Sequence, residues 1–287
     1  MALMGTLYVV GTPIGNLEDI TLRALRVLGS VHVIACEDTR HTRTLLGRHG
    51  IARPLLSYHE HNERERAPQL VRRLLAGEDV ALVTDAGMPG ISDPGFHLVT
   101  QAIAAGVTVT AIPGPSAITA ALSVAGLPAD RFLFLGFLPR TRKARQRALR
   151  EVAGIPATLV FFEAPHRVHE MLEDATSILG ARRAALVREA TKVHEEVLRG
   201  PLVDLTSRIA GRRLRGEITL VVEGAAHPSA ETVARQPDAA PREEPARYLR
   251  RLLRAGMSRR DAARSLAEAY GIPRRRAYQL AAELTGP

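Results

Sequence analysis

Several kinds of residue are scarce in this chain, and each scarcity narrows what the protein can be. A single cysteine, Cys36, excludes an internal disulfide framework and a cysteine zinc cluster, so we expect it to be a small buried apolar residue. No apolar run approaches the roughly 18 residues of a membrane span. The first residues also lack the charged region of a signal peptide. With 46% hydrophobic residues, the chain is predicted to be globular and cytoplasmic.

Aromatic residues are also rare, at 4% with no tryptophan, which argues against recognition of nucleic acid by base stacking. The net charge of +9 nevertheless favours a polyanionic partner. Only Lys143 and Lys192 are lysines among the 39 basic residues, a bias that a GC-rich genome would also produce. That bias explains arginine in place of lysine but not the excess of base over acid, so contact with nucleic acid is predicted.

The first half of the chain holds three apolar runs that each lead into a glycine- and proline-rich turn. The runs are 7–10, 80–83 and 107–112, and the turns are 11–16, 85–90 and 113–116. A strand that ends in such a turn brings bare backbone to the carboxyl edge of a sheet, where open α/β sheets bind ligands. Three such turns predict one shared small-molecule pocket.

Strand-like and helix-like segments alternate through an N-terminal domain, residues 1–118, which predicts a largely parallel sheet covered on both faces. Thr21 and Ser116 are expected to cap the helices that follow them. A second α/β domain is expected over 119–224, and its short connections leave room for antiparallel pairing. The expected strands are 7–10, 31–35, 80–83, 107–112, 131–137, 158–162, 184–187 and 217–223, with helices in the second domain at about 142–151, 166–179 and 202–210.

The C-terminal part has a different character. Residues 225–245 lose periodicity and are predicted to form a linker, and residues 246–287 are predicted to form a basic helical segment. Three short helices, at 246–255, 258–270 and 273–284, resemble a helix-turn-helix module, with breaks at Gly256 and Gly271 and a cap at Ser258. Ten arginines against two acids between residues 246 and 276 favour nucleic-acid binding, and a solvated helical cap is the alternative.

The first turn does not match the dinucleotide-binding fingerprint. The spacing of Gly11 and Gly15 is not G-x-G-x-x-G, and Pro13 stands where the second glycine should admit a pyrophosphate. Glu37 or Asp38 could pass for the ribose-binding acid of such a site, but the spacing argues against a nicotinamide or flavin cofactor.

Taken together, the three turns resemble the loops of the tetrapyrrole methylase superfamily, through the segments 9–17, 85–95 and 113–117. The segments 36–40, 59–63 and 162–167 resemble one branch of it, the small-subunit ribosomal RNA cytidine 2′-O-methyltransferases. The resemblance extends over residues 5 to 224 and to the C-terminal helices.

The resemblance implies a fold and a function. The fold is α/β, with two α/β domains, a cleft for S-adenosylmethionine between them, and a short C-terminal helical segment. The function is methylation of the 2′-hydroxyl of a cytidine in the decoding region of 16S ribosomal RNA, within the small ribosomal subunit and by a homodimer.

The resemblance also implies that the cofactor is bound largely through backbone. The residues expected at its site are Gly11, Pro13, Gly15, Gly87, Met88, Pro89, Ile91, Ser116, Ala117, Phe162, Gly216 and Ile218. A side chain added at Gly15 or Gly87 is expected to clash with the ligand or to strain the turn.

Methyl transfer to a sugar hydroxyl needs aligned reacting atoms and either a general base or cations that stabilise the developing oxyanion. Two clusters offer such groups, and the base is left open between them. They are Glu163, His166 and Arg167 in one turn, and Glu189, Lys192 and Glu195 in another. Each also has a structural interpretation as ordinary ion pairs, because Glu163 and Arg167 are four residues apart and Lys192 lies among acids.

RNA is expected to contact His59 and Asn62 at the rim of the cleft and two basic stretches. The phosphate contacts expected there are Arg140, Arg142 and Arg145 in the first stretch, and Arg274, Arg275 and Arg276 in the tail. A solvated helix face is the alternative for the first stretch, and binding should depend strongly on salt. No metal site is expected at His59 and His61, since no cysteine or third histidine lies nearby.

Two other functions remain open from the sequence. One is methylation of a tetrapyrrole (precorrin or uroporphyrinogen) intermediate on the same fold, against which the basic stretches argue. The other is a non-catalytic nucleic-acid-binding regulator that only senses S-adenosylmethionine.

Overall fold

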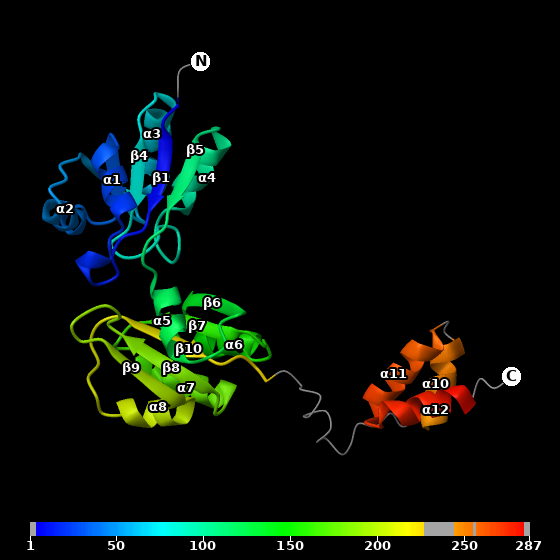
Figure 1. Ribbon diagram of the computed structural model, residues 1–287. Coiled ribbons are helices and arrows are strands. Elements are labelled where there is room, and N and C mark those ends of the chain that lie inside the picture. Colours follow the sequence, from blue (N-terminus) through cyan, green and yellow to red (C-terminus); the bar gives the residue numbers. More distant parts are fainter. Residues whose placement is uncertain (1–3, 227–243, 255–256, 284–287) are drawn as a thin grey trace. The chain divides into compact units, whose positions relative to one another are not determined.

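The computed structural model describes residues 4–226, 244–254 and 257–283, and it divides into two compact units at residue 225. The larger unit holds two five-stranded sheets, seen one above the other in Figure 1. The smaller unit is helical. Within the described ranges, no helix combines the length and the apolar character that a membrane crossing requires.

The first sheet is entirely parallel, as predicted, in the order β3-β2-β4-β1-β5. Its strands are β1 (Thr6–Val10), β2 (Val33–Cys36), β3 (Leu55–Ser57), β4 (Val80–Val83) and β5 (Thr108–Ile112). All four residues of β2 and of β4 are buried, as expected for central strands covered on both faces. The edge strand β3 was not predicted from the sequence, and it is only half-buried.

Helices cover both faces of this sheet, which confirms the prediction. One face carries α1 (Leu22–Ser30) and α2 (Thr39–Arg48), preceded by the short helix η1 (Leu17–Asp19). The other carries α3 (Glu63–Leu75) and α4 (Phe96–Ala104). Cys36 is fully buried in the first of these layers, and the Thr21 side chain caps α1 by accepting a hydrogen bond from the Ala24 amide, 3.1 Å away. Both observations agree with the sequence.

The second sheet is mixed, in the order β6-β7-β10-β8-β9. Its strands are β6 (Phe132–Phe137), β7 (Thr158–Glu163), β8 (Arg183–Arg188), β9 (Glu196–Pro201) and β10 (Ile218–Val222). Only β6 and β7 pair in parallel; β10 is antiparallel to β7 and β8, and β8 to β9. The short connections therefore give the antiparallel pairing that was expected, and β9 is an edge strand that the sequence did not predict.

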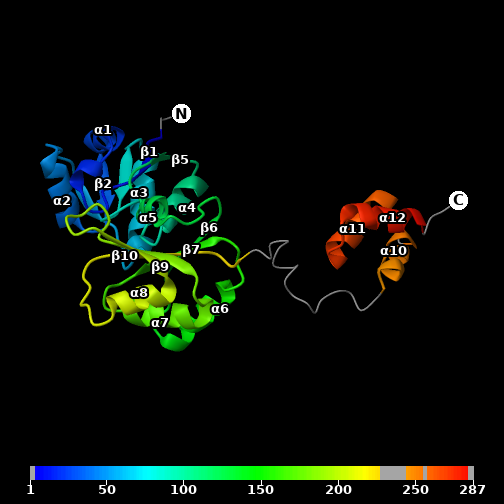
Figure 2. The same cartoon turned by 60° about the horizontal axis from the view of Figure 1, so that its bottom comes forward.

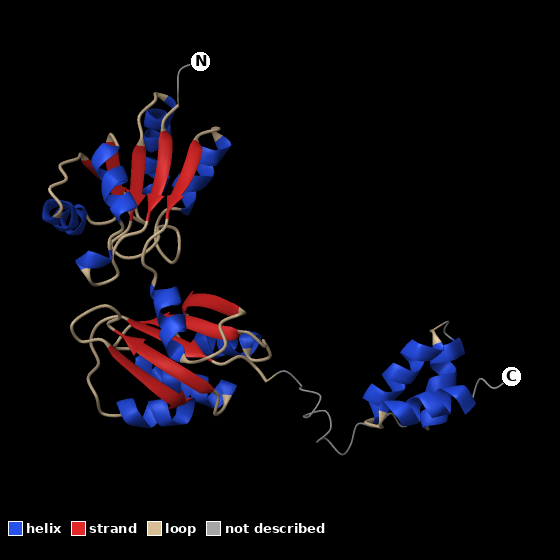
Figure 3. Ribbon diagram, viewed as in Figure 1, coloured by secondary structure: helices blue, strands red, loops and turns tan. Residues whose placement is uncertain are grey.

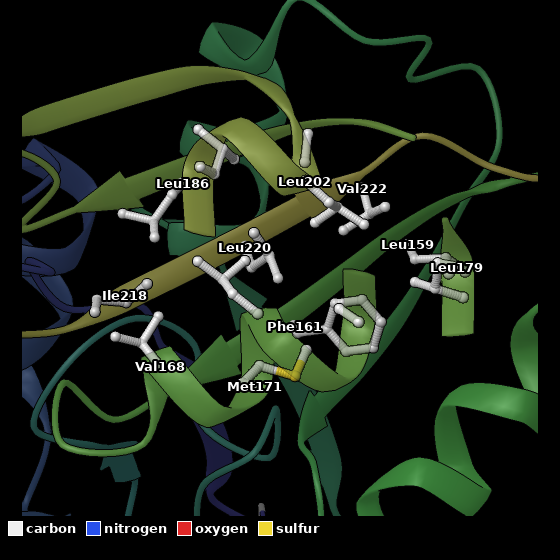
Figure 4. Close-up of a cluster of buried hydrophobic side chains, with 14 of the residues drawn as sticks. Leu159, Phe161, Val168, Met171, Leu179, Leu186, Leu202, Ile218, Leu220 and Val222 are labelled. Carbon is white, nitrogen blue, oxygen red and sulfur yellow. The ribbon is translucent and has the colours of Figure 1, made fainter. Parts of the chain in front are cut away.

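The main core of the second domain lies between this sheet and the helices α6 (Arg142–Val152), α7 (Val168–Leu179) and α8 (Leu202–Ile209). Figure 4 shows Phe161 and Leu220 of the sheet meeting Met171 of α7 in this layer. The opposite face carries α5 (Ala117–Ala125), whose Ile118 and Leu122 are buried there. The domain boundary predicted after residue 118 falls within α5.

Ser116 was expected to cap α5. It occupies the N-cap position, but its side chain makes no capping hydrogen bond. The hydroxyl is therefore not what starts this helix.

A buried ion pair joins α6 to α7. The Arg145 side chain is fully buried, and its Nε donates to Asp174 Oδ2 over 2.7 Å while its Nη2 donates to Glu170 Oε2 over 3.0 Å. Burial alone would raise the pKa of Asp174, but hydrogen bonds from Gln146, Arg145 and Arg142 lower it. The expectation that Arg145 contacts phosphate is therefore corrected: this guanidinium is part of the domain core. Arg142 also binds Asp174, although its side chain is 71% exposed.

The smaller unit contains α10 (Pro245–Arg254), α11 (Arg259–Tyr270) and α12 (Arg274–Glu283), which confirms the three predicted helices (Figure 2). Leu249 and Leu266 are fully buried in its core, together with several alanines. Ser258 caps α11 as predicted, and Gly271 ends it in a left-handed conformation with φ 62°. Most of the predicted linker, and Gly256, lie outside the described residues.

We expect Arg145→Met to lower the free energy of unfolding by about 3 kcal/mol, because it removes the buried positive charge beside Asp174 and leaves this carboxylate to Gln146 and the exposed Arg142. Urea unfolding of the full chain measures this. The control is Arg147→Met on the same helix, whose side chain is 79% exposed and pairs with Glu151 at 3.7 Å; it should change stability by no more than about 0.5 kcal/mol. Equal effects of the two substitutions would contradict a structural role for Arg145.

Candidate active site

The three glycine- and proline-rich turns meet at the carboxyl edge of the first sheet, where the strands in Figure 3 run into a cluster of loops. Thr12 and Gly87 exchange two backbone hydrogen bonds, of 2.9 and 3.1 Å, which join the first turn to the second. The Gly11 amide donates to the Ile112 carbonyl at 3.0 Å, which joins the first turn to the end of β5. The turns thus form one hydrogen-bonded platform.

Glycine is required where the first and third turns touch. A Cβ on Gly11 would lie 2.8 Å from the Gly114 backbone and 2.7 Å from the Met88 sulfur. A Cβ on Gly114 would lie 2.8 Å from the Gly11 carbonyl oxygen. The backbones can approach this closely only because neither residue has a side chain.

Beside these turns lies a cavity of about 410 Å³ with walls from both α/β domains. This volume falls within the range of small-molecule sites. Its apolar and small lining residues are Ile14, Ala86, Met88, Ile91, Ala117, Ile118, Phe137, Phe162, Ala164, Pro165, Gly216 and Ile218, and its polar ones are Glu37, Asp85, Ser92, Asp93, Ser116, Glu163, Glu217 and Thr219.

Many of the residues predicted for cofactor binding line this cavity. They are Met88, Ile91, Ser116, Ala117, Phe162, Gly216 and Ile218. The others, Gly11, Pro13, Gly15, Gly87 and Pro89, belong to the turns but do not line it. Four of these are buried, and Gly15 instead contacts the second domain, since a Cβ there would lie 2.4 Å from the Lys192 Cγ. Gly87 has φ 78° and no atom closer than 3.7 Å to an added Cβ, so conformation, not space, requires glycine there.

An aromatic cluster forms one wall of the cavity. The Phe162 ring lies 4.9 Å from that of Phe134 and 5.7 Å from that of Phe137, between centroids. Phe137 and Phe162 both line the cavity. These rings hold each other in place and give the site a flat apolar surface of the kind that a purine ring can contact.

Carboxylates dominate the polar lining: Glu37, Asp85, Asp93, Glu163 and Glu217. No described lysine or arginine lines the cavity. Burial, and then the charges of Glu37, Asp85 and Glu217, raise the pKa of Asp93 to about 7. Burial likewise raises the pKa of Glu37. The cavity is therefore suited to a positively charged ligand, which would relieve the repulsion among these groups.

Of these carboxylates, sequence reasoning selected only Glu163 for the site. Glu37 and Asp85 follow β2 and β4 closely, and Asp93 lies further along the second turn. Acidic residues that directly follow parallel strands meet at one sheet edge, and that signal was available in the sequence.

The two oxygens of Glu163 have different surroundings. Oε1 accepts a hydrogen bond from the Ala164 amide at 2.9 Å and lies 3.4 Å from the Arg167 Nε. Oε2 is buried and has no hydrogen-bond partner among the described residues. Arg167 also donates to the Leu138 carbonyl at 2.8 Å, so this arginine ties the turn to the end of β6. Glu163 thus has one oxygen held by local contacts and one buried oxygen that lacks a partner within the described part of the chain.

The second predicted cluster lies beside the cavity. Lys192 Nζ donates to Glu189 Oε1 at 2.9 Å and to Glu217 Oε2 at 3.0 Å, and of these residues only Glu217 lines the cavity. Burial alone would raise the pKa of Glu189, but the hydrogen bond from Lys192 contributes to lowering it. Glu195 accepts a hydrogen bond from the Thr191 amide at 2.6 Å.

The loop between β8 and β9, which carries Glu189 and Lys192, also shows local backbone strain. Glu189 and Thr191 adopt positive φ, 52° and 67°, which is unusual for residues with side chains. The Thr191 hydroxyl accepts a hydrogen bond from the Asn16 amide at 3.1 Å, which links this loop to the first turn. The loop that carries Lys192 is therefore held against the N-terminal domain.

The residues expected at the rim have local structural partners. Asn62 Oδ1 accepts from the His59 amide at 2.9 Å, and Asn62 Nδ2 donates to the Ser57 carbonyl at 3.2 Å, which closes the turn before α3. Neither residue lines the cavity. Arg140 is exposed, and Arg274, Arg275 and Arg276 are exposed at the start of α12. The described residues contain no group of three metal-ligating side chains placed to hold a metal.

Comparison with known proteins gives consistent matches. Residues 6–206 match the family model of the tetrapyrrole (corrin/porphyrin) methylases. The chain is 47% identical over 281 residues to the ribosomal RNA small subunit methyltransferase I of Xylella fastidiosa strain Temecula1, covering 97% of this chain and 99% of that one. It is 47% identical over 285 residues to the protein of the same name from Pseudomonas aeruginosa, covering 98% of each chain.

A solved structure also matches in fold. The uroporphyrin-III-C-methyltransferase of Thermus thermophilus aligns with a TM-score of 0.52 and 24% identity, covering 76% of this chain and 94% of that one. At this identity the likeness concerns the fold alone.

Gly216→Ala is expected to lower both stability and cofactor affinity. Gly216 has φ 82°, and an added Cβ would lie 2.1 Å from the Glu189 carboxyl carbon, so alanine must displace the partner of Lys192. The matched control is Gly211→Ala, at φ 72°, where an added Cβ would have no described atom within 4 Å, so it should cost only about 1–2 kcal/mol of backbone strain. Calorimetry should show that the affinity for S-adenosylmethionine falls about tenfold in Gly216→Ala and stays unchanged in the control. Equal affinities in the two variants would contradict this account.

Asp93→Asn should stabilise the protein without ligand, and more so as pH rises. Because burial raises the pKa of Asp93 to about 7, the folded chain binds this proton more tightly than the unfolded chain. The resulting stability is complete below the ordinary pKa of the group and is lost as pH rises through about 7. With solvent screening of this half-buried group, we expect a gain of about 1 kcal/mol, or about 2–4 °C in the melting temperature, at pH 8.

Melting curves at pH 5 and pH 8 measure this effect. The gain should be clearly smaller at pH 5, where the folded-state carboxyl is already protonated. Asp130→Asn is the control, because the Asp130 side chain is 77% exposed, and it should show no such pH dependence. A gain for Asp93→Asn that does not change with pH would refute the assignment.

Proposed function

This chain belongs to the tetrapyrrole (corrin/porphyrin) methylase family, and we propose that it methylates small-subunit ribosomal RNA, on the 2′-oxygen of a cytidine in the decoding region of 16S ribosomal RNA. The observation that carries the proposal is the 47% identity to ribosomal RNA small subunit methyltransferases over nearly the full length of both chains. The chemistry of the cavity described above supports the same reaction.

The cavity fits S-adenosylmethionine in three respects. Phe162 offers an aromatic face for the adenine, Met88 and Ile91 add apolar surface, and the carboxylates of Asp85 and Glu217 suit a ligand with a positive sulfonium and ammonium group. When bound, S-adenosylmethionine supplies an electrophilic methyl group on a sulfur that leaves as a neutral thioether. Ser116 and Ala117 would complete the site at the start of α5.

Glu163 is the residue best suited to accept the proton of the 2′-hydroxyl. The unpartnered Oε2 would take the proton of the 2′-hydroxyl, and the contacts of Oε1 with Ala164 and Arg167 would hold the carboxylate in place. Arg167 acts here as a positioning residue. The bridge from Lys192 to Glu217 orients a second carboxylate of the cavity wall.

The tail supports a polyanionic substrate. Arg274, Arg275 and Arg276 are exposed at the beginning of α12, where the helix dipole disfavours positive charge. None of the three side chains has a hydrogen bond or ion pair within the part of the chain that is described. Such an arrangement is stabilised when phosphates approach, which favours RNA over a small macrocycle as substrate.

The test incubates the full chain with methyl-labelled S-adenosylmethionine and small ribosomal subunits that lack the modification, and then locates the label by nuclease digestion and mass spectrometry. We expect label on the 2′-oxygen of a decoding-region cytidine. Glu163→Gln should reduce turnover at least about 100-fold, because it removes the proton acceptor. Its affinity for S-adenosylmethionine, measured by calorimetry, should stay within about threefold.

The matched control is Glu173→Gln, an exposed glutamate on α7 outside the cavity, which should keep full turnover. Normal turnover of Glu163→Gln would remove Glu163 from the mechanism. No label on RNA, despite cofactor binding, would favour methylation of a tetrapyrrole or a sensor role.

A further inference from the structure

A second cavity, of about 570 Å³, lies next to the first and shares Pro165 and Gly216 with it. Its remaining lining comes from two segments: His166 and His169 around the start of α7, and residues 212–215 between α8 and β10. No acidic residue of the described chain lines it. The two neighbouring cavities therefore have opposite character, one lined by carboxylates and the other by arginine and histidine.

Two arginine side chains of this second cavity have no hydrogen-bond or ion-pair partner among the described residues. The side chains of Arg213 and Arg215 are exposed and make no hydrogen bond or ion pair with any residue that the structure describes, and the same holds for His166. Arg212, in contrast, is bound to Glu196 at 2.9 Å. Arg213 and Arg215 thus keep their full charge available for an anion from outside the chain.

The segment that carries these arginines is anchored at several points. Leu214 lies between them in sequence and is only 8% exposed, packed into the main core of the second domain. The Arg212 amide donates to the Ile209 carbonyl at 2.9 Å, and Arg188 donates to the Arg215 carbonyl at 3.4 Å. His169 Nε2 lies 3.0 Å from the Arg212 carbonyl oxygen. The backbone is therefore fixed while two cationic side chains remain free, which lowers the entropic cost of binding an anion.

We propose that this second cavity binds the phosphodiester group next to the ribose that is methylated. The inference rests on the proposed function and adds a location for the substrate backbone. In RNA, the 2′-hydroxyl and the 3′-phosphate occupy adjacent carbons of one ribose. A ribose whose 2′-oxygen reaches Glu163 must therefore place a phosphate within a few ångströms of the first cavity.

The shared wall meets this requirement. Pro165 follows Glu163 by two residues, and Gly216 lines both cavities. Carboxylates around the first cavity repel phosphate, so the neighbouring basic cavity is where the charge of the backbone is accommodated. Arginine suits this role because its guanidinium can donate two parallel hydrogen bonds to a phosphate.

The experiment compares the full-length double variant Arg213→Gln/Arg215→Gln with the unmodified chain in methylation of small subunits that lack the modification. The control is Arg23→Gln/Arg26→Gln, which removes the same charge from exposed positions on α1 outside both cavities. We expect the cavity variant to raise KM for the subunits about tenfold, with kcat and cofactor affinity nearly unchanged. A plot of the logarithm of RNA affinity against the logarithm of salt concentration should be less steep for the cavity variant than for the control, by about 1 in slope.

A second measurement locates the contact. Binding of a synthetic decoding-region oligonucleotide is compared with that of the same oligonucleotide carrying one uncharged methylphosphonate 3′ to the target cytidine. The uncharged linkage should weaken binding to the unmodified chain and to the α1 control, but not to the cavity variant. Equal KM and salt slope in the cavity and α1 variants would overturn the proposal while leaving the proposed function intact.

A free phosphate ion could also bind to Arg213 and Arg215 in the second cavity, and a further measurement distinguishes it from the RNA backbone. If inorganic phosphate at constant ionic strength inhibits the unmodified chain but not the cavity variant, and the methylphosphonate has no effect, the cavity is a free-anion site and the proposal fails. If the unmodified chain does not methylate RNA at all, the proposed function fails first, before any variant is compared, and the phosphodiester site fails with it.

Discussion

The close backbone contact between Gly11 and Gly114 is the constraint on which the cavity depends. It allows the first and third turns to touch without intervening side chains, and the paired hydrogen bonds of Thr12 and Gly87 add the second turn to the same platform. These contacts lie at the carboxyl ends of parallel strands, so the rigid sheet determines their position. The turns beside the cavity are therefore ordered before a ligand binds, and little of the binding free energy is spent on ordering them.

Much of the fold could be predicted from the sequence, because its central strands are apolar runs that end in recognisable turns. β3 and β9 were missed because β3 has only three residues and β9 is interrupted by charged residues, glycine and proline, so neither is an apolar run. The site was harder to predict. The carboxylates of Asp85 and Asp93 join Glu217 only through the folded chain, and the burial of Arg145 depends on Asp174, 29 residues away. The roles of the residues placed in the cavity remain predictions.

The arginines of this chain have at least three different functions in its structure, although a net charge counts them alike. Arg145 belongs to a core, Arg167 ties a turn to the neighbouring strand, and Arg212 is bound to Glu196. The side chains of Arg213 and Arg215 have no such partner among the residues that the structure describes. The number of arginines in the composition therefore overstates the surface that is available to a polyanion.

The segment 212–215 has a consequence for how this fold diversifies. It connects α8 to β10 and is anchored mainly through one leucine and backbone hydrogen bonds, whereas the platform of three turns belongs to the other sheet. Mutations that exchange its arginines for apolar residues would leave that platform intact. An ancestral enzyme could in this way acquire a new substrate by drift in one short connection, and a laboratory library restricted to it is a direct route to altered specificity.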